Sequence, residues 1–400
     1  NVIDQENMAV ILQEVVGKQH DGRYYPNFSG VLRSLNYYPI GDEKAEEGIA
    51  SLALGLGKYI VDGGQTLRVS PYHPHQVLQT SELETALRQT QTRFYALDTR
   101  HVGNDFTVDD GFNILNLRVK EAERDNALSY IASTYDPYDN VIRDGLYDGG
   151  RKVISFAGVL QQDVFPLPEL LQMSMKYGAE SMRRPVEIEF ACNLNEDRTG
   201  QFYLLQIRPI VDSKQMLEED VAAIPDEDCL VRSHNSLGHG VSEDVTDVVY
   251  VKADDNFSAA ENPTIAREIE KINSGYLDRG QGYVLVGPGR WGSSDSWLGI
   301  PIKWPHISAA RVIVEVALKN YRVDPSQGTH FFQNLTSFGV GYFTVDENRN
   351  EGVFHKAMLD AMPAVEETEH VRVVRFSKPL RILMDGKKQE GAVVPVCRPS

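Results

Sequence analysis

The stretch from Val186 to Ile210, VEIEFACNLNEDRTGQFYLLQIRPI, constrains the fold of this chain more than any other. Two runs rich in β-branched and aromatic residues flank the polar residues NEDRTG, a pattern that predicts an antiparallel hairpin. Side chains alternate between the two faces of a strand, so Glu187 and Glu189 share one face, and Gln206 and Arg208 share one on the returning strand. The apolar side chains of the returning strand are expected on the opposite face: Tyr203, Leu205 and Ile207.

The polar face of this hairpin indicates what kind of ligand the hairpin could bind. If the apolar rows face a core, two carboxylates, an amide and a guanidinium converge on the other side. Mg²⁺ prefers carboxylate oxygens and shared phosphate oxygens, and arginine grips phosphate with a planar fork. The hairpin therefore indicates a Mg-nucleotide triphosphate site. An alternative stays open, because polar residues at every second position also describe the solvated face of an ordinary antiparallel sheet.

The composition excludes several classes of protein. A hydrophobic content of 42% with 24% charged residues is ordinary for a soluble globular protein, and 400 residues suffice for about two or three domains. The net charge of −17 argues against a general nucleic-acid or anionic-membrane surface. No apolar run approaches a membrane span, and no stretch of this sequence has the pattern of a signal peptide. The cysteines, too few and too scattered for a disulfide framework or a zinc site, favour a reducing cytoplasm: Cys192, Cys229 and Cys397.

Four further segments predict secondary structure before the hairpin. Met8–Val16 (MAVILQEVV) is an apolar run typical of a buried strand, and Phe28–Asn36 predicts a second strand. Glu47–Gly64, with its small and apolar residues, suits a helix or a tight turn against a sheet. Leu167–Ala179 has helical periodicity.

The hairpin resembles the end of the nucleotide-binding domain in the family of phosphoenolpyruvate synthase and pyruvate phosphate dikinase. In that family an acidic D-I-E-W strand and a following L-Q-x-R-P strand close an ATP-grasp site. The matching residues here are Glu187-Ile188-Glu189-Phe190 and Leu205-Gln206-Ile207-Arg208-Pro209. The four earlier segments follow the family's order, and Arg33 and Ser34 fall where the family places a strand near the nucleotide.

This resemblance implies an ATP-grasp domain that uses ATP and Mg²⁺. Glu187 and Glu189 would hold Mg²⁺, Gln206 would orient phosphates or metal, and Arg208 would neutralise charge on the transferred group. The residues near the adenine hinge would be Gln13, Glu14 and Val16. The family's first subdomain has no counterpart in this sequence. We therefore expect a piece of a longer parent protein, whose missing N-terminal subdomain would be a partner of this one.

The expected fold class is α+β, with the C-terminal half of an ATP-grasp domain over residues 1–211, an acidic linker over 212–228 and a second α/β domain over 229–400. Strands are predicted in that second domain at Val248–Lys252, Tyr283–Val286 and Val371–Phe376, helices at Pro263–Asn273 and Ile307–Leu318, and a hairpin at Leu380–Val394.

Two stretches of the second domain are candidates for a functional site. Gly287–Ser294 (GPGRWGSS) could cradle an anion with its backbone amides, or form a packing turn around Trp291. Gly328-Thr329-His330 is similar to the phosphohistidine motif of the dikinase family's swivelling domain, which makes the second domain swivel-like and His330 a candidate for phosphorylation. A packed or capping histidine is the alternative, because Phe331 and Phe332 replace the small residues of that motif.

The expected function is that of an ATP-dependent phosphotransferase of the dikinase type, passing phosphoryl to a histidine and then to pyruvate or a similar acceptor. This fragment alone would be nearly inactive. Its partners would be that small-molecule acceptor and, in a possible homo-oligomer, further copies of the chain, with no nucleic acid and no membrane. The alternative is a non-catalytic nucleotide-sensing or scaffold module.

Overall fold

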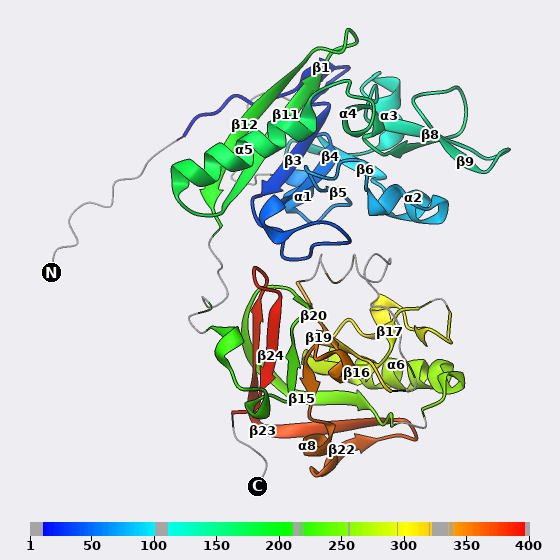
Figure 1. The fold of residues 1–400 in the computed structure, drawn as a ribbon. Coiled ribbons are helices and arrows are strands. Elements are labelled where there is room, and N and C mark those ends of the chain that lie inside the picture. Colours follow the sequence, from blue (N-terminus) through cyan, green and yellow to red (C-terminus); the bar gives the residue numbers. More distant parts are fainter. Residues whose placement is uncertain are drawn as a thin grey trace. The chain divides into compact units, whose positions relative to one another are not determined.

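A computed structural model describes the chain over residues 11–100, 111–210, 217, 220–254, 257–293, 295–319, 321, 335 and 339–396. The described residues fall into two compact units (Figure 1). The first holds those of 1–34 and 48–210, and the second holds those of 35–47 and 211–400. The stretch Leu35–Glu47, which the sequence assigns to the first domain, thus belongs to the second unit.

The central sheet of the first unit is antiparallel, with strand order β12-β11-β3-β4-β5. The predicted hairpin is confirmed, with its tip at residues 195–199, and so is the strand at the start of Phe28–Asn36. The five strands are β3 (Phe28–Arg33), β4 (Ile49–Leu54), β5 (Leu67–Val69), β11 (Val186–Leu194) and β12 (Gly200–Pro209).

Helix α5 (Leu167–Met182) covers the apolar face of this sheet, beside β11 and β12 in Figure 1. The predicted helix Leu167–Ala179 is therefore confirmed and runs three residues further. Gly178 allows the helix to approach closely, since a Cβ there would lie 2.7 Å from the Ile207 side chain. Leu167 and Leu171 of α5 bury their side chains in the same core as Ile188 of β11.

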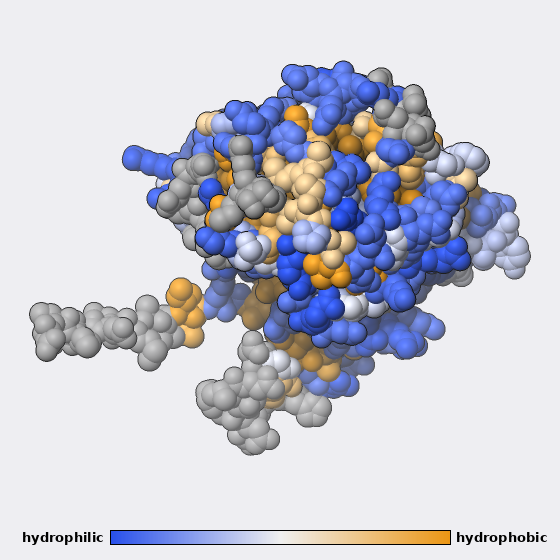
Figure 2. Space-filling view, turned by 90° about the horizontal axis from the view of Figure 1, so that it is seen from below, coloured by the Kyte–Doolittle hydropathy of each residue, from blue (hydrophilic) through white to orange (hydrophobic). Residues whose placement is uncertain are grey.

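One predicted element of the first unit is wrong, and another is confirmed only in part. The described part of Met8–Val16 forms no strand, and Ile11 and Leu12 are 88% and 94% exposed. Figure 2 shows this hydrophobic start of the described chain next to the grey N-terminal segment. Within Glu47–Gly64, the predicted helix is confirmed only at the short α1 (Lys58–Val61), and the six residues Ile49–Leu54 form strand β4 instead. The alanine and glycine residues of this stretch favoured a helix or turn, but β4 pairs with β3 on one side and with β5 on the other, and this pairing decides its conformation.

Two smaller antiparallel sheets and short helices complete the first unit. The four-stranded sheet has the order β1-β2-β6-β7, with β1 (Lys18–His20), β2 (Arg23–Tyr25), β6 (Arg93–Asp98) and β7 (Ile114–Arg118). The three-stranded sheet has the order β10-β8-β9, with β8 (Ala132–Asp136), β9 (Val141–Asp144) and β10 (Arg151–Ile154). The remaining helices are α2 (Leu83–Gln89), α3 (Val119–Arg124) and α4 (Ala157–Leu160).

The second unit is built on a curled, mixed half-barrel sheet (Figure 1). Its order is β14-β20-β19-β16-β15-β23-β24-β13-β21, with β22 paired to β23, and β15, β16, β19 and β20 run parallel. Their bounds are β13 (Val231–Ser233), β14 (Ser236–Leu237), β15 (Gly240–Val251), β16 (Tyr283–Pro288), β19 (Ala310–Val316), β20 (Gly341–Val345), β21 (Val353–Phe354), β22 (Ala364–Glu367), β23 (Val371–Asp385) and β24 (Glu390–Val394). The α-helices whose bounds are described in this unit are α6 (Asn262–Arg279) and α8 (Lys356–Asp360).

Most predicted elements of the second unit are confirmed: the strands within β15, β16 and β23, the helix within α6, and the β23–β24 hairpin. The helix predicted at Ile307–Leu318 is wrong, because this stretch contains strand β19. Val312, Ile313 and Val314 are fully buried in succession, with Ile313 in one core and its neighbours in another. A strand buried on both faces loses the alternation that identifies strands in a sequence.

One described residue of the predicted acidic linker is buried, while most of residues 220–228 are exposed. Val221 is fully buried against Cys229 and Leu383, in a small apolar cluster of the second unit. Among the described residues, no helix is long and apolar enough to cross a membrane. The face of the molecule in Figure 2 is mostly hydrophilic, around a patch of hydrophobic residues.

Candidate functional site

The hairpin places its polar side chains on one face, as the sequence predicts. Glu187 on β11 lies opposite Arg208 on β12, and Glu189 lies opposite Gln206. The next strand on the other side, β3, adds Arg33 opposite Glu187. Two adjacent rows result, which we call the arginine row (Arg33, Glu187 and Arg208) and the amide row (Glu189 and Gln206).

The apolar face differs from the prediction in one detail. The pairing register between β11 and β12 shifts between Glu189 and Phe190. Phe202, and not Tyr203, therefore packs into the core, where its ring stacks on Phe190 with the centroids 4.9 Å apart. A bulge of this kind cannot be read from strand alternation, because it shifts the phase by one residue.

In the arginine row, both oxygens of the Glu187 carboxylate accept hydrogen bonds from guanidinium groups. Arg33 donates from Nε to Oε2 at 2.7 Å, and Arg208 donates to Oε1 from Nε at 2.9 Å and also from Nη2. The Glu187 side chain is only 10% exposed, whereas the arginines are 55% and 56% exposed. Burial alone would raise the pKa of Glu187, but the two arginines outweigh it, so the pKa is lowered and the group stays ionised.

The amide row is less constrained. Within the described part of the chain, the side chains of Glu189 and Gln206 make no hydrogen bond or ion pair. Glu189 is half-buried and Gln206 is exposed. The charge of Glu189 helps to raise the pKa of Arg208, after the larger effect of Glu187, which shows that the two rows interact. A carboxylate and an amide oxygen side by side are suitable ligands for Mg²⁺.

The same face continues across the sheet to residues that the sequence did not single out as a site. Val31 on β3, beside Glu189, pairs with Ser51 on β4, and Ser51 pairs with Arg68 on β5. Arg68 extends the basic character of the face. Nothing in the sequence indicated that Arg68 shares this face, because Arg68 lies far from the hairpin along the chain. Only strand pairing brings β5 into this sheet.

Of the residues predicted for the adenine hinge, Gln13 lies at the edge of the sheet formed by β12. Gln13 donates from Nε2 to the carbonyl oxygen of Leu205, the residue before Gln206 on β12, at 3.0 Å. Glu14 is exposed and Val16 is half-buried in the same irregular segment. The structure thus brings Gln13 next to the amide row, and an adenine contact stays a prediction.

The described residues give no support to either candidate stretch of the second unit as a functional site. His330 lies outside the described residues, so its phosphorylation stays a prediction. In the glycine-rich loop, Trp291 is fully buried and donates from its backbone nitrogen to Glu315 Oε1 at 3.0 Å. A Cβ on Gly287 would lie 2.4 Å from the Trp291 ring. These contacts favour the packing turn over an anion cradle.

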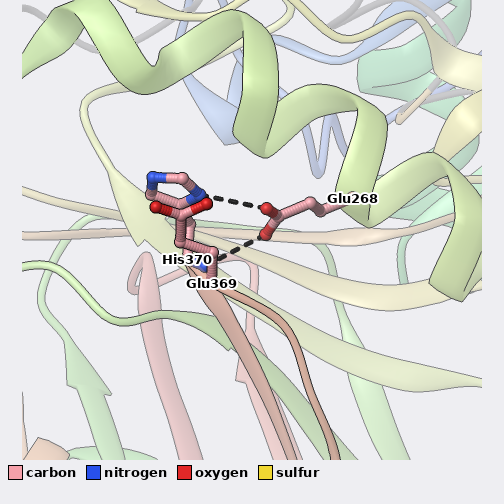
Figure 3. A group of neighbouring side chains, drawn as sticks. All are labelled: Glu268, Glu369 and His370. Atoms are coloured by element: carbon pink, nitrogen blue, oxygen red, sulfur yellow. Dashed lines mark hydrogen bonds and ion pairs between the residues drawn. The ribbon is translucent and has the colours of Figure 1, made fainter.

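A second polar cluster joins Glu268 of α6 to Glu369 and His370, which lie between β22 and β23 (Figure 3). Their ligand atoms all lie within 4.8 Å of one another, so a metal ion would fit them. The oxygens of Glu268 are already engaged, one by His370 Nδ1 at 3.0 Å and the other by the Thr368 hydroxyl at 2.5 Å. The hydrogen bonds of the cluster therefore link α6 to the turn between β22 and β23.

Acidic, amide and guanidinium side chains on one face of an antiparallel sheet are the groups with which ATP-binding domains hold a metal-nucleotide. Residues 2–228 match the family model described as "Pyruvate phosphate dikinase, AMP/ATP-binding domain". The match covers more than half of the chain, and the chain belongs to this family. Residues 229–400 lie outside the match, and no curated protein matches the chain.

Proposed function

We propose that the first unit binds Mg-ATP on the polar face of its central sheet and takes part in ATP-dependent phosphoryl transfer. The observation that carries the proposal is the adjacency of the arginine row and the amide row in a chain of an ATP-binding family. The arginine row offers guanidinium donors to phosphate oxygens, and the amide row offers oxygens to Mg²⁺.

The roles of individual residues follow from their contacts. Glu189 and Gln206 would share Mg²⁺ with phosphate oxygens, since neither side chain has a partner among the described residues. Arg208 would neutralise charge on the transferred phosphoryl group, because a guanidinium that stays charged stabilises such a transition state. In the wider proposal, a histidine such as His330 receives the phosphoryl group and pyruvate or a similar acceptor takes it on.

Binding of Mg-ATP to the 400-residue chain, measured by titration calorimetry, tests the proposal. Glu189→Gln keeps the size of the side chain but removes its charge. We expect it to weaken Mg-ATP binding about tenfold or more and to leave ATP binding in EDTA nearly unchanged. An exposed carboxylate on another element, Glu84→Gln on α2, is the matched control. Equal binding by wild type and Glu189→Gln would contradict the assignment of the metal.

A non-catalytic nucleotide sensor is the second candidate. The two candidates differ in covalent chemistry, so ATP labelled at the β or the γ phosphate separates them when it is incubated with the expected longer parent protein, since the 400-residue chain alone is expected to be nearly inactive. Label that becomes attached to a histidine, acid-labile and stable to alkali, supports the phosphotransferase. Mg-ATP binding with no label on the protein supports the sensor.

A further inference from the structure

We infer that Arg33 and Arg208 form a two-arginine clamp for a polyphosphate chain, and that Glu187 positions this clamp instead of binding the metal. The inference rests on the proposed nucleotide site and assigns a different task to each of its two rows. It adds Arg33 as a phosphate-binding residue and removes Glu187 from the expected metal ligands.

The geometry of the arginine row supports a clamp. Arg33 and Arg208 come from the strands on either side of β11, and both guanidinium groups turn inward to the Glu187 carboxylate between them. The hydrogen bonds use Nε of Arg33, and Nε and Nη2 of Arg208. Among the described residues, the two terminal nitrogens of Arg33 and Nη1 of Arg208 have no hydrogen-bond partner. Donors from two strands therefore remain available beside one another.

The charges of the row also suit an anion. One carboxylate and two guanidinium groups leave a net charge of about +1, since arginine stays protonated at any pH of interest. The carboxylate is nearly buried while more than half of each arginine side chain is exposed, so the positive groups are the accessible ones. A hydrogen bond between charged partners also holds each long side chain in one geometry, which lowers the entropy cost of binding.

The same contacts argue against Glu187 as a metal ligand. Oε1 already accepts two hydrogen bonds from Arg208, and a metal ion at the remaining lone pair of Oε2 would lie between two positively charged guanidinium groups. Among the described residues, no guanidinium group is hydrogen-bonded to the carboxylate of Glu189. We therefore assign Mg²⁺ to the amide row and the phosphate chain to the arginine row.

Inorganic tripolyphosphate tests the clamp, because it has the phosphate chain of ATP without the base or the ribose. Its affinity for the 400-residue chain is measured with Mg²⁺ and with EDTA. Arg33→Met should weaken binding about tenfold in both conditions, as expected for one lost charge-assisted hydrogen bond. Glu187→Gln should also weaken binding in both, because the amide nitrogen that replaces one carboxylate oxygen cannot accept, so one of the two arginines loses the contact that holds it. Glu189→Gln should weaken it only with Mg²⁺.

Arg88→Met provides the matched control, since Arg88 is an exposed arginine of α2 in a surface ion pair with Glu84. Circular dichroism and thermal unfolding establish that each variant is folded, and Arg33→Met tests the clamp even if Glu187→Gln does not fold. A loss in Glu187→Gln that requires Mg²⁺ would make Glu187 a metal ligand and overturn the inference.

The remaining outcomes separate the clamp from the proposed function. Wild-type binding of Mg-ATP that Arg33→Met leaves unchanged overturns the clamp while the nucleotide site stands. Tripolyphosphate binding that depends on Arg33, without any binding of Mg-ATP, supports the clamp and contradicts the proposed function. No binding of either probe by the wild type overturns both.

Discussion

Asp247 illustrates how a single buried charge is held in this protein. Its side chain is almost fully buried, and it accepts two hydrogen bonds from Arg375, at 2.8 Å and 2.7 Å, one from the Tyr276 hydroxyl at 2.5 Å and one from the Thr246 hydroxyl at 2.7 Å. Burial would raise the pKa of Asp247, but these hydrogen bonds lower it. Removing the guanidinium would leave a buried carboxylate with two hydroxyl donors and without the positive charge of Arg375.

We expect Arg375→Met to lower the free energy of unfolding by about 1–3 kcal/mol, because the desolvated Asp247 would lose two charge-assisted hydrogen bonds. Urea unfolding followed by circular dichroism measures this change. Arg311→Met is the matched control, since Arg311 is equally exposed (46%) but lies 3.9 Å from the exposed Asp244. Equal effects of the two substitutions would show that the Asp247 contacts contribute no more than a surface ion pair.

At the scale of elements, the β3–β11 pairing depends on a glycine. A Cβ on Gly30 would lie 2.2 Å from the Phe190 ring, which is confined by stacking on Phe202. We expect Gly30→Ala to destabilise the first unit by about 1–3 kcal/mol through overpacking, measured by urea unfolding. At Gly57, where φ is −60° and the nearest heavy atom would be 3.5 Å away, alanine should be tolerated. A stable Gly30→Ala variant would mean that the sheet can shift to make room.

At the scale of the whole molecule, the pKa shifts predict a loss of stability in acid. The pKa values of Glu187, Asp247 and Glu268 are all lowered in the folded state, because hydrogen bonds to cationic or hydroxyl partners outweigh burial. A lowered folded-state pKa stabilises the protein above the unfolded value, about 4, and this stabilisation disappears as the pH falls through the folded value.

We therefore expect the free energy of unfolding to fall steadily between about pH 5 and pH 2, in urea titrations at constant ionic strength. The Glu187→Gln variant has no carboxyl group at position 187 that acid could protonate. The unfolding transition of its first unit should therefore depend less steeply on pH. Stability that is constant or rises on acidification would contradict the cited pKa directions.

Much of this fold could be predicted because local patterns survive in it. The turn residues and alternation of Val186–Ile210 gave the hairpin and the shared face of Glu187 and Glu189, and both are confirmed. The apolar stripe of α6 likewise gave a helix. Predictions failed where burial removed the pattern, as in β19, or where an apolar segment found no partner strand among the described residues, as at Ile11 and Leu12.

The sequence by itself determined the residue types of the site and their order along each strand, because side-chain direction in a strand follows from backbone geometry alone. Only the tertiary structure decided that Arg33, separated by 154 positions from Glu187, would be its neighbour. It also decided that both Glu187 oxygens would be held by arginines. Such contacts depend on which strands pair, and pairing is set by the packing of the whole sheet against its core, which no local pattern encodes.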